Sequence, residues 1–460
     1  MFLVASVADG REYYVSARGN DASPGTRSQP WKTIARVNRW PVGPGDGVFF
    51  HGGQTFAGSL VLAYAPHAAG SASITISSYG TGRATIAAGK STAISILNSA
   101  AVVRRLILRG AGPAANRATR LEILNQACDD SKLDGVTFED VEASGFRWAG
   151  IYVGGSPRPG PGACGDSQAG FRHVRLVRGA TRGNAYAGIH ISGRWQAAPR
   201  GYANEDVTIV DSTAHDNPGD AQNLESHTGD GILLEDTDGA VIERCRAWRN
   251  GGPVGIWAHN ATGIVIQYCE SSGNRTGGAA DGGGFDFDGG ASHSVMQYNR
   301  SHDNDGPGYM IWNYQNANRP VEDNVIRCNL SEGDARRHAY TSNSRPALIA
   351  VRGSGNRAIE IAENLLIPLG AGKLIETEGA PDAVGYRENL LIGKPGTFLV
   401  CDGGRVYRSP EAWRAATGRE LAHAGTTAGR AFLARTMANL RLPAAACRAP
   451  DHPADGSDRP

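Results

Sequence analysis

Val265-Ile-Gln-Tyr-Cys269 and Val295-Met-Gln-Tyr-Asn299 are two copies of one short unit, and this unit decides the fold of the chain. Related copies recur on both sides of them, at residues 136–140, 207–211, 241–245, 325–329, 359–364 and 385–389. A turn-rich stretch commonly follows each copy, and a second short segment then opens on a glycine: Gly150, Gly188, Gly231, Gly255, Gly284 and Gly308. Both segments alternate apolar and polar residues with a period of two, which predicts strands with one buried face.

Short strands separated by turns rather than helices cannot build a doubly wound sheet, but they can stack in parallel from one coil to the next. The repeat therefore predicts an all-β chain, a single-stranded right-handed parallel β-helix with coils about 4.8 Å apart. The last residue of the first segment falls at one register position, which we expect to form an inward column: Cys245, Cys269, Asn299, Asn329, Asn364 and Asn389. Stacked asparagines can hydrogen-bond along the axis, and the two cysteines are predicted to be core residues rather than catalytic thiols.

The N-terminal segment reads Tyr13-Tyr-Val-Ser-Ala-Arg-Gly-Asn-Asp-Ala-Ser-Pro-Gly-Thr26, then Gln29-Pro-Trp-Lys-Thr-Ile34, then Gly45-Asp-Gly-Val-Phe-Phe50 and Gly52-Gly-Gln-Thr-Phe-Ala-Gly58. It closely resembles the opening of bacterial right-handed β-helix proteins of the pectate-lyase superfamily. The resemblance in architecture covers about residues 11–400. It implies that this segment supplies a cap and the first coils.

The repeat pattern changes after Asp402, where Ser409-Pro-Glu-Ala-Trp-Arg-Ala-Ala-Thr-Gly418 has a Ser-Pro helix start and a glycine stop. This segment resembles the cap that such proteins place over the last coil. We expect four segments: a signal-peptide remnant or a frayed terminus at 1–10, the β-helix at 11–402, the C-terminal cap at 403–448 and a disordered tail at 449–460.

The net charge and composition limit the kinds of partner that the chain can attract. A formal net charge of +1, without a long charge run, gives no long-range attraction to nucleic acid or to an anionic membrane. Residues 1–8 are short, apolar and end in small residues, like the tail of a signal peptide, which favours a secreted or periplasmic protein. Seven cysteines are odd in number; Cys128 with Cys164 and Cys401 with Cys447 are the candidate disulfides. The sequence does not predict an oligomeric state.

The second strands carry the candidate site. Their first and third residues after the glycine are apolar, so the second and fourth residues are expected to face solvent together. These outward residues are Tyr152, His190, Leu233, Trp257, Asp286 and Met310 at the second position, and Gly154, Ser192, Glu235, His259, Asp288 and Trp312 at the fourth. Aromatic rings beside carboxylates suit a sugar chain, which stacks on rings and hydrogen-bonds through its hydroxyl groups.

Asp286 and Asp288 share a face because they are two residues apart on one strand, and Glu235, His259 and Asp288 are expected to form a column on successive coils. Glycosidic hydrolysis needs two carboxyl groups, one protonated acid and one base or nucleophile. We predict Asp288 as the acid and Asp286 as the base or nucleophile. Glu235, a third carboxylate of the catalytic cluster, and His259 are predicted to tune the pair or to bind the sugar. A calcium site and simple turn chemistry are the alternatives for the two aspartates.

The predicted sugar contacts are Trp257, His259, Trp312, His190 and Tyr152 on the strands, with Glu225, His227 and Asp230 from the long connection that precedes Gly231. A connection of that length can overhang the face and line one wall of a cleft.

The sequence is consistent with three functions. The fold family contains glycoside hydrolases, polysaccharide lyases, epimerases and adhesins, so the resemblance does not decide the chemistry. Its lyases usually employ a Lys or Arg base beside acidic calcium ligands, but the central coils contain no lysine, and no outward second or fourth position there is Arg. We therefore expect a glycoside hydrolase that acts on a polysaccharide or oligosaccharide and requires no cofactor, with a calcium-dependent lyase and a carbohydrate-binding module as alternatives.

Overall fold

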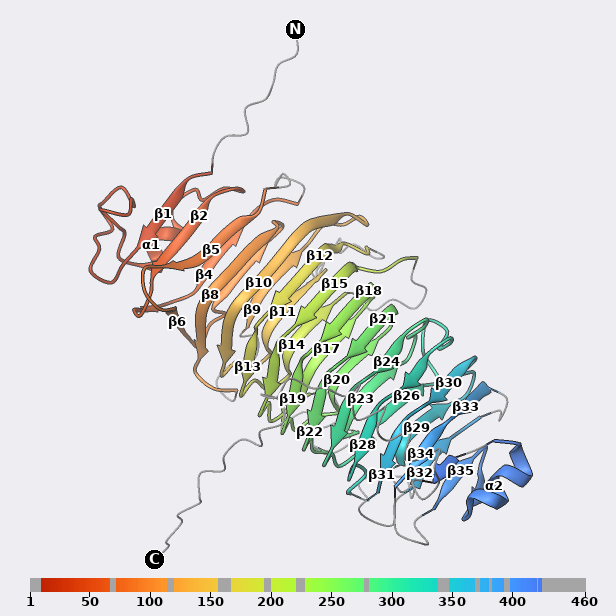
Figure 1. The fold of residues 1–460 in the computed structure, drawn as a ribbon. Coiled ribbons are helices and arrows are strands. Elements are labelled where there is room, and N and C mark those ends of the chain that lie inside the picture. Colours follow the sequence, from red (N-terminus) through yellow and green to blue (C-terminus); the bar gives the residue numbers. More distant parts are fainter. Residues whose placement is uncertain are drawn as a thin grey trace, which may run out of the picture.

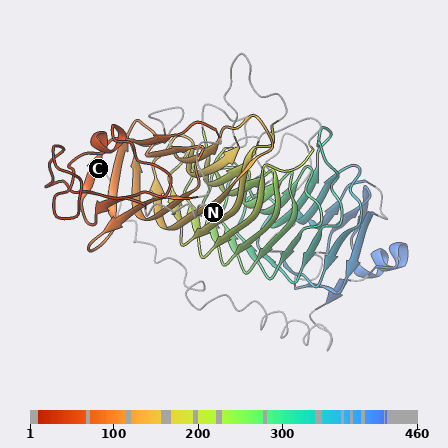
Figure 2. The ribbon, with the colours of Figure 1, turned by 90° about the horizontal axis from the view of Figure 1, so that it is seen from above.

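The repeated units pair in parallel with the units one coil before and one coil after. Val265 in β21 (Thr262–Gln267) lies opposite Val241 in β18 (Thr237–Glu243) and Val295 in β24 (Val295–Gln297). In this computed structural model the coils stack along one axis into a long solenoid (Figures 1 and 2). The structure describes residues 10–66, 72–113, 120–155, 167–193, 200–220, 228–276, 281–337, 347–368, 373–379, 383–392, 398–419 and 421–423. The predicted right-handed parallel β-helix is confirmed.

Two sheets run the length of the solenoid. The larger sheet contains β18, β21, β24 and the following strands: β1 (Glu12–Val15), β2 (Gly47–His51), β3 (Thr55–Ala57), β5 (Ile74–Tyr79), β6 (Ala84–Gly89), β8 (Ala101–Gly110), β10 (Lys132–Ser144), β12 (Gly170–Val177), β13 (Ala180–Arg182), β15 (Asn204–Val210), β16 (Thr213–His215), β19 (Arg246–Trp248), β22 (Glu270–Ser272), β25 (Arg300–His302), β27 (Val325–Arg327), β28 (Leu330–Glu332), β30 (Ile359–Ala362), β31 (Leu365–Ile367), β33 (Val384–Arg387), β34 (Asn389–Leu391) and β37 (Leu421–His423).

The second sheet is built from the strands that open on glycine and their neighbours along the axis. In spatial order these strands are β4 (Leu60–Ala63), β7 (Ile94–Leu97), β9 (Leu121–Asn125), β11 (Ala149–Gly155), β14 (Ala187–Ser192), β17 (Asp230–Glu235), β20 (Val254–His259), β23 (Gly283–Asp288), β26 (Tyr309–Asn313), β29 (Ala347–Gly353), β32 (Lys373–Thr377), β35 (Val400–Asp402) and β36 (Arg405–Tyr407). All pair in parallel except β35 with β36, which are antiparallel.

The core fills the space enclosed by the sheets with one row of apolar side chains per coil. Ile256, Phe285 and Ile311 of the second sheet are completely buried in it. Tyr309 lies opposite Phe285 on the next coil and stacks on it at 5.1 Å. Its hydroxyl group shares its proton between the carbonyl oxygens of Asn299 and Leu330, each at 2.9 Å. The predicted core position of Tyr309 is confirmed.

The predicted inward column is a continuous hydrogen-bonded ladder. The backbone N–H of Cys269 donates to Oδ1 of Asn299 at 2.9 Å, and that of Asn299 donates to Oδ1 of Asn329 at 2.9 Å. In the same way, the backbone N–H of Asn329 donates to Oδ1 of Asn364 at 3.1 Å, and that of Asn364 donates to Oδ1 of Asn389 at 3.0 Å. Cys245 and Cys269 are completely buried and belong to this column, so their structural assignment is confirmed.

A second ladder, which the sequence analysis did not identify, runs beside the bend that leads into the second sheet. Its members bond in the same way along the axis: Asn184, Asn217, Asn250, Asn274, Asn304 and Asp334. These residues lie in the segments whose sequence predicted only turns.

Each end of the described solenoid has a helix. At the first end, α1 (Ile34–Asn38) begins after Thr33, whose hydroxyl accepts the N–H of Arg36, and the buried ring of Trp31 stacks on Tyr13 at 4.9 Å. At the other end, α2 (Pro410–Thr417) is capped by Ser409 and by Gly418 in the left-handed conformation, as predicted (Figure 1). β37 then pairs with β34, so the chain returns to the solenoid after α2. Among the described residues, no helix has the length and apolar character needed to span a bilayer.

The predicted pairing of Cys401 is wrong, because Cys401 is a free thiol on β35. Cys128 is disulfide-bonded, and its predicted partner, Cys164, lies outside the described residues.

The ladder predicts a large loss of stability when one member is removed. Asn329→Ala deprives the N–H of Asn299 and the carbonyl of Met296 of their buried partners. Each unsatisfied buried group costs about 1–3 kcal/mol, so we expect the free energy of unfolding to fall by roughly 2–5 kcal/mol in urea titrations. Arg327→Ala, at an exposed position two residues earlier, is the control and is expected to change the free energy of unfolding by about 0.5 kcal/mol or less. Equal small effects of the two substitutions would contradict the role of the ladder.

Candidate functional site

The outer face of the second sheet carries two columns of side chains, in the phase that the sequence predicted. At the fourth position, Glu235 lies opposite His259, and His259 lies opposite Asp288. At the second position, Leu233 lies opposite Trp257, and Trp257 lies opposite Asp286. The predicted column of Glu235, His259 and Asp288 on three successive coils is therefore confirmed.

The expectation that this face is open to solvent is wrong for most of its residues. Tyr152, His190, Trp257, Asp286 and Asp288 are all buried, with exposed fractions between 1% and 8%. The physical reason is that the outward side chains pack on one another. Three small apolar clusters lie on the described part of this face: Leu124, Ala149, Tyr152 and Ala187; Leu233, Val254 and Trp257 with Tyr186; and Met310, Ala347 and Ala350 with Trp312. Glu235, His259 and Trp312 stay partly exposed.

Asp230 lies inside the sheet rather than on the wall of a cleft, so that prediction is wrong. It is the first residue of β17, is completely buried, and accepts the indole N–H of Trp257 at 3.1 Å. Burial raises the pKa of Asp230 well above its ordinary value. Glu225 and His227, the other two residues predicted from this connection, lie outside the described residues.

Glu235 is held as an ionised carboxylate by three side chains. Its Oε2 atom is 2.6 Å from Nε2 of His190 and accepts the hydroxyl of Ser192 at 2.8 Å, and its Oε1 atom is 3.5 Å from Nδ1 of His259. Burial alone would raise the pKa of Glu235, but the charges and hydrogen bonds of His190 and His259 outweigh it and hold that pKa far below its ordinary value.

His259 connects Glu235 to Tyr314, a residue that the sequence analysis missed. Burial tends to lower the pKa of His259, but the hydrogen bond and charge of Glu235 raise it above the ordinary value. The other ring nitrogen, Nε2, is 2.6 Å from the hydroxyl of Tyr314, and the two rings stack 5.8 Å apart. Tyr314 follows β26, beyond the alternating strand pattern, so the period of the repeat gave no signal for it.

Asp286 has the opposite environment to Glu235. It is 1% exposed, and its Oδ1 atom has no hydrogen-bond partner among the described residues. Burial raises the pKa of Asp286 well above its ordinary value, and the charges of Asp288 and Asp281 raise it further. The Oδ1 atom of the neighbouring Asp288 accepts the backbone N–H of Gly289 at 2.7 Å.

Asp281 and Arg352 border the pair. Burial raises the pKa of Asp281 to about 7, while the guanidinium of Arg352 opposes that shift. The Nη1 atom of Arg352 is 3.8 Å from Oδ1 of Asp281, and its Nη2 atom is 3.6 Å from Oε2 of Glu376. The guanidinium thus lies between two buried carboxyl groups.

The described part of the chain offers no ligand set for a metal ion, because no three of its His, Cys, Asp and Glu side chains are grouped so as to hold one. No step of the reaction proposed below passes through a metal. Independence of calcium stays a prediction.

Comparison with known proteins agrees with this architecture. A family model described as a right-handed beta helix region matches residues 123–325. No curated protein matches the chain significantly by sequence.

Three solved structures illustrate the likeness. The native GH136 lacto-N-biosidase from Eubacterium ramulus is 18% identical with a TM-score of 0.58, and the match covers 84% of this chain and 67% of that one. Its selenomethionine derivative is 15% identical over the same shares, with a TM-score of 0.51. Pectate lyase Pel9A is 16% identical, with 83% of this chain and 79% of that chain covered and a TM-score of 0.45. At such identities a likeness concerns the fold alone. The chain has the fold of a right-handed parallel β-helix.

Proposed function

We propose that the protein is a carbohydrate-active enzyme that hydrolyses a glycosidic bond of a polysaccharide or oligosaccharide. The observation that carries this proposal is the contrast between Asp286, a buried carboxyl group with a strongly raised pKa, and the ionised Glu235 on the same sheet face. Carboxyl groups whose surroundings drive their pKa values apart are the pattern expected of an acid working beside a base or nucleophile.

In the proposed reaction, Asp286 donates its proton to the glycosidic oxygen as the bond to the anomeric carbon breaks. Asp288 lies about 7 Å along the same strand and has one of two roles. It either takes a proton from the water that attacks the anomeric carbon, or attacks that carbon itself and forms a glycosyl ester. In the second case water then hydrolyses the ester, and Asp286 takes the proton of that water. This is the reverse of the order of roles expected from the sequence, and the raised pKa of Asp286 favours it. Glu235, fixed by His190 and Ser192, supplies a further negative charge that stabilises the positive charge developing on the sugar ring.

The charges on this face support hydrolysis over the lyase alternative. A lyase of the pectate-lyase superfamily would need a free basic side chain to remove a proton beside a uronate carboxylate. Arg352 instead lies between Asp281 and Glu376, and His190 and His259 both contact Glu235.

We also propose that the protein acts in the periplasm or outside the cell. The disulfide of Cys128 supports this, because such bonds persist in oxidising compartments. Wild-type protein purified from the periplasm or culture medium should carry that disulfide. Titration of the free thiols of the exported protein checks this, with the Cys128→Ser variant as the reference.

Asp286→Asn is expected to lower kcat by about 10²–10⁴-fold, because an amide cannot donate the proton to the leaving oxygen. The measurement is the release of reducing ends from a panel of polysaccharides, with ultraviolet absorbance recorded in parallel to detect an unsaturated lyase product. Met310→Leu, one coil further in the same column, is the matched control and should retain turnover. Full turnover in Asp286→Asn and in Asp288→Asn would refute the assignment, and turnover lost to a chelator would restore the calcium alternative.

Asp281→Asn is expected to move the alkaline limb of the pH profile to lower pH. The charge on Asp281 helps to raise the pKa of Asp286, so the acid loses its proton more readily when that charge is removed. The limb of kcat/KM should shift down by roughly half to one pH unit, with little change on the acidic side. Asp206→Asn, on the exposed surface, is the control. An unchanged limb in Asp281→Asn would show that Asp281 does not act on the acid.

A further inference from the structure

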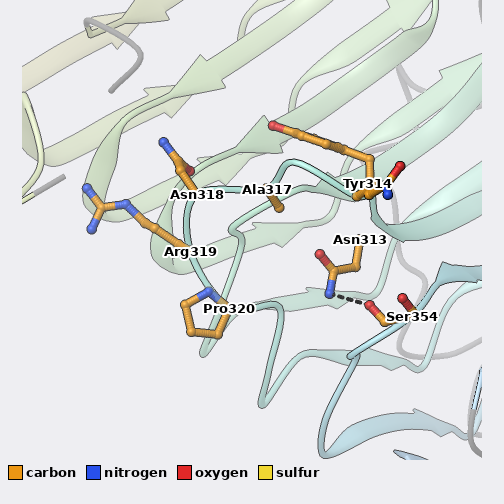
Figure 3. Close-up of a pocket in the computed structure, with 8 residues that line it drawn as sticks. Asn313, Tyr314, Ala317, Asn318, Arg319, Pro320 and Ser354 are labelled. Carbon is orange, nitrogen blue, oxygen red and sulfur yellow. Dashed lines mark hydrogen bonds between the residues drawn. The ribbon is translucent and has the colours of Figure 1, made fainter. Parts of the chain in front are cut away.

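We propose that a pocket beside Tyr314 binds one unit of a neutral glycan next to the carboxylates; this rests on the hydrolase function proposed above and names its substrate class. The pocket has a volume of about 430 Å³, within the range of about 300–1,000 Å³ typical of ligand sites. It lies in the connection that follows β26, and its lining includes Asn313, Tyr314, Gln315, Asn318, Arg319 and Ser354 (Figure 3).

The wall of the pocket is fixed by hydrogen bonds at both ends. The side-chain amide of Asn313 donates to the carbonyl oxygen of Ser354 at 2.8 Å, as Figure 3 shows. The backbone N–H of Ala317 donates to the carbonyl oxygen of Tyr314 at 3.0 Å, which closes a turn between them. The pocket is therefore preorganised, a property that lowers the entropic cost of binding a ligand.

Arg319 anchors the same connection to an earlier coil. Its Nε atom donates to Oδ1 of Asn260 at 2.8 Å, its Nη2 atom donates to the carbonyl oxygen of Gly201, and its guanidinium lies 3.8 Å from the ring centroid of Tyr202. Asp236 lies 3.7 Å from the same guanidinium. Because its donors and its charge are engaged by the protein, Arg319 does not offer the positive charge that a uronate carboxylate would need.

Tyr314 joins the pocket to the carboxylate columns. Its hydroxyl meets His259, which contacts Glu235. Its ring packs so closely on Gly289, the residue after Asp288, that a Cβ atom there would lie 2.1 Å from the ring. A sugar unit in the pocket would thus have its neighbour in the chain beside Asp288.

The chemistry of the lining favours a neutral sugar. Amide groups, a backbone carbonyl and a tyrosine ring match the hydroxyl groups and the C–H face of a pyranose. The adjoining column holds Glu235, whose lowered pKa keeps a negative charge there that repels an acidic sugar. Arg352 on the same face already lies between two carboxyl groups.

The test is binding by Asp286→Asn, used so that the ligand is not consumed. Calorimetric titrations are made with neutral tetrasaccharides (cello-, xylo-, manno- and N-acetyllactosamine-type) and with tetragalacturonate. We expect at least one neutral tetrasaccharide to bind and tetragalacturonate to bind at least tenfold more weakly. Preferred binding of tetragalacturonate, or binding of no neutral tetrasaccharide, would overturn the proposal.

Ala317→Trp, added to Asp286→Asn, places an indole in the pocket and should weaken binding of the neutral ligand at least tenfold. Val406→Trp, at an exposed position on β36, is the matched control and should leave binding unchanged. Gln315→Ala, at an exposed lining position, provides a second variant in case the bulky residue disturbs folding, and it should weaken binding several-fold. Unchanged binding in both lining variants would rule out the pocket as the subsite. The hydrolase function itself is tested separately, by comparing turnover in Asp286→Asn with turnover in the wild-type protein.

Discussion

The structure depends on the ladder of side-chain amides that joins successive coils. Each ladder residue follows a residue in the left-handed conformation, such as Tyr298, Cys328 and Glu363, with φ between 55° and 57°. That conformation costs about 1–2 kcal/mol for a residue with a side chain. The bonds from Asn299 to Asn329 and onward offset the cost and satisfy buried backbone N–H groups. They also fix the register, because a slip of one residue would turn every side chain to the other face.

A fixed register places chemically different residues in one column at the spacing of the coils. Glu235, His259 and Asp288 come from strands far apart in the sequence, yet they lie on adjacent coils. The scaffold therefore sets the distance between ionisable groups, and the immediate neighbours set their charge. Histidines on both sides lower the pKa of Glu235. Asp286 is flanked along its column by Trp257 and Met310, and burial raises its pKa.

The sequence predicted the parts of this arrangement that are local. The period of two and the opening glycine were sufficient to predict that Glu235, His259 and Asp288 lie on the same face of the sheet. Burial was not predictable in the same way, because the residues that cover the face, such as Tyr186 and Tyr314, come from turns that have no period. The second ladder was missed for the same reason: Asn250, Asn274 and Asn304 resemble ordinary turn residues until the stacking of the coils places them in line.

The burial of Asp286 is the strongest reason to assign chemistry to this face. A buried polar group without a partner costs about 1–3 kcal/mol, and Oδ1 of Asp286 has no hydrogen-bond partner among the described residues. The same column accepts apolar side chains on nearby coils, since Leu233 and Met310 are each 1% exposed there. An apolar residue at position 286 would therefore fit the packing without that cost. A carboxyl group that weakens the fold where an apolar group would serve is the pattern of a residue placed for reaction rather than for stability.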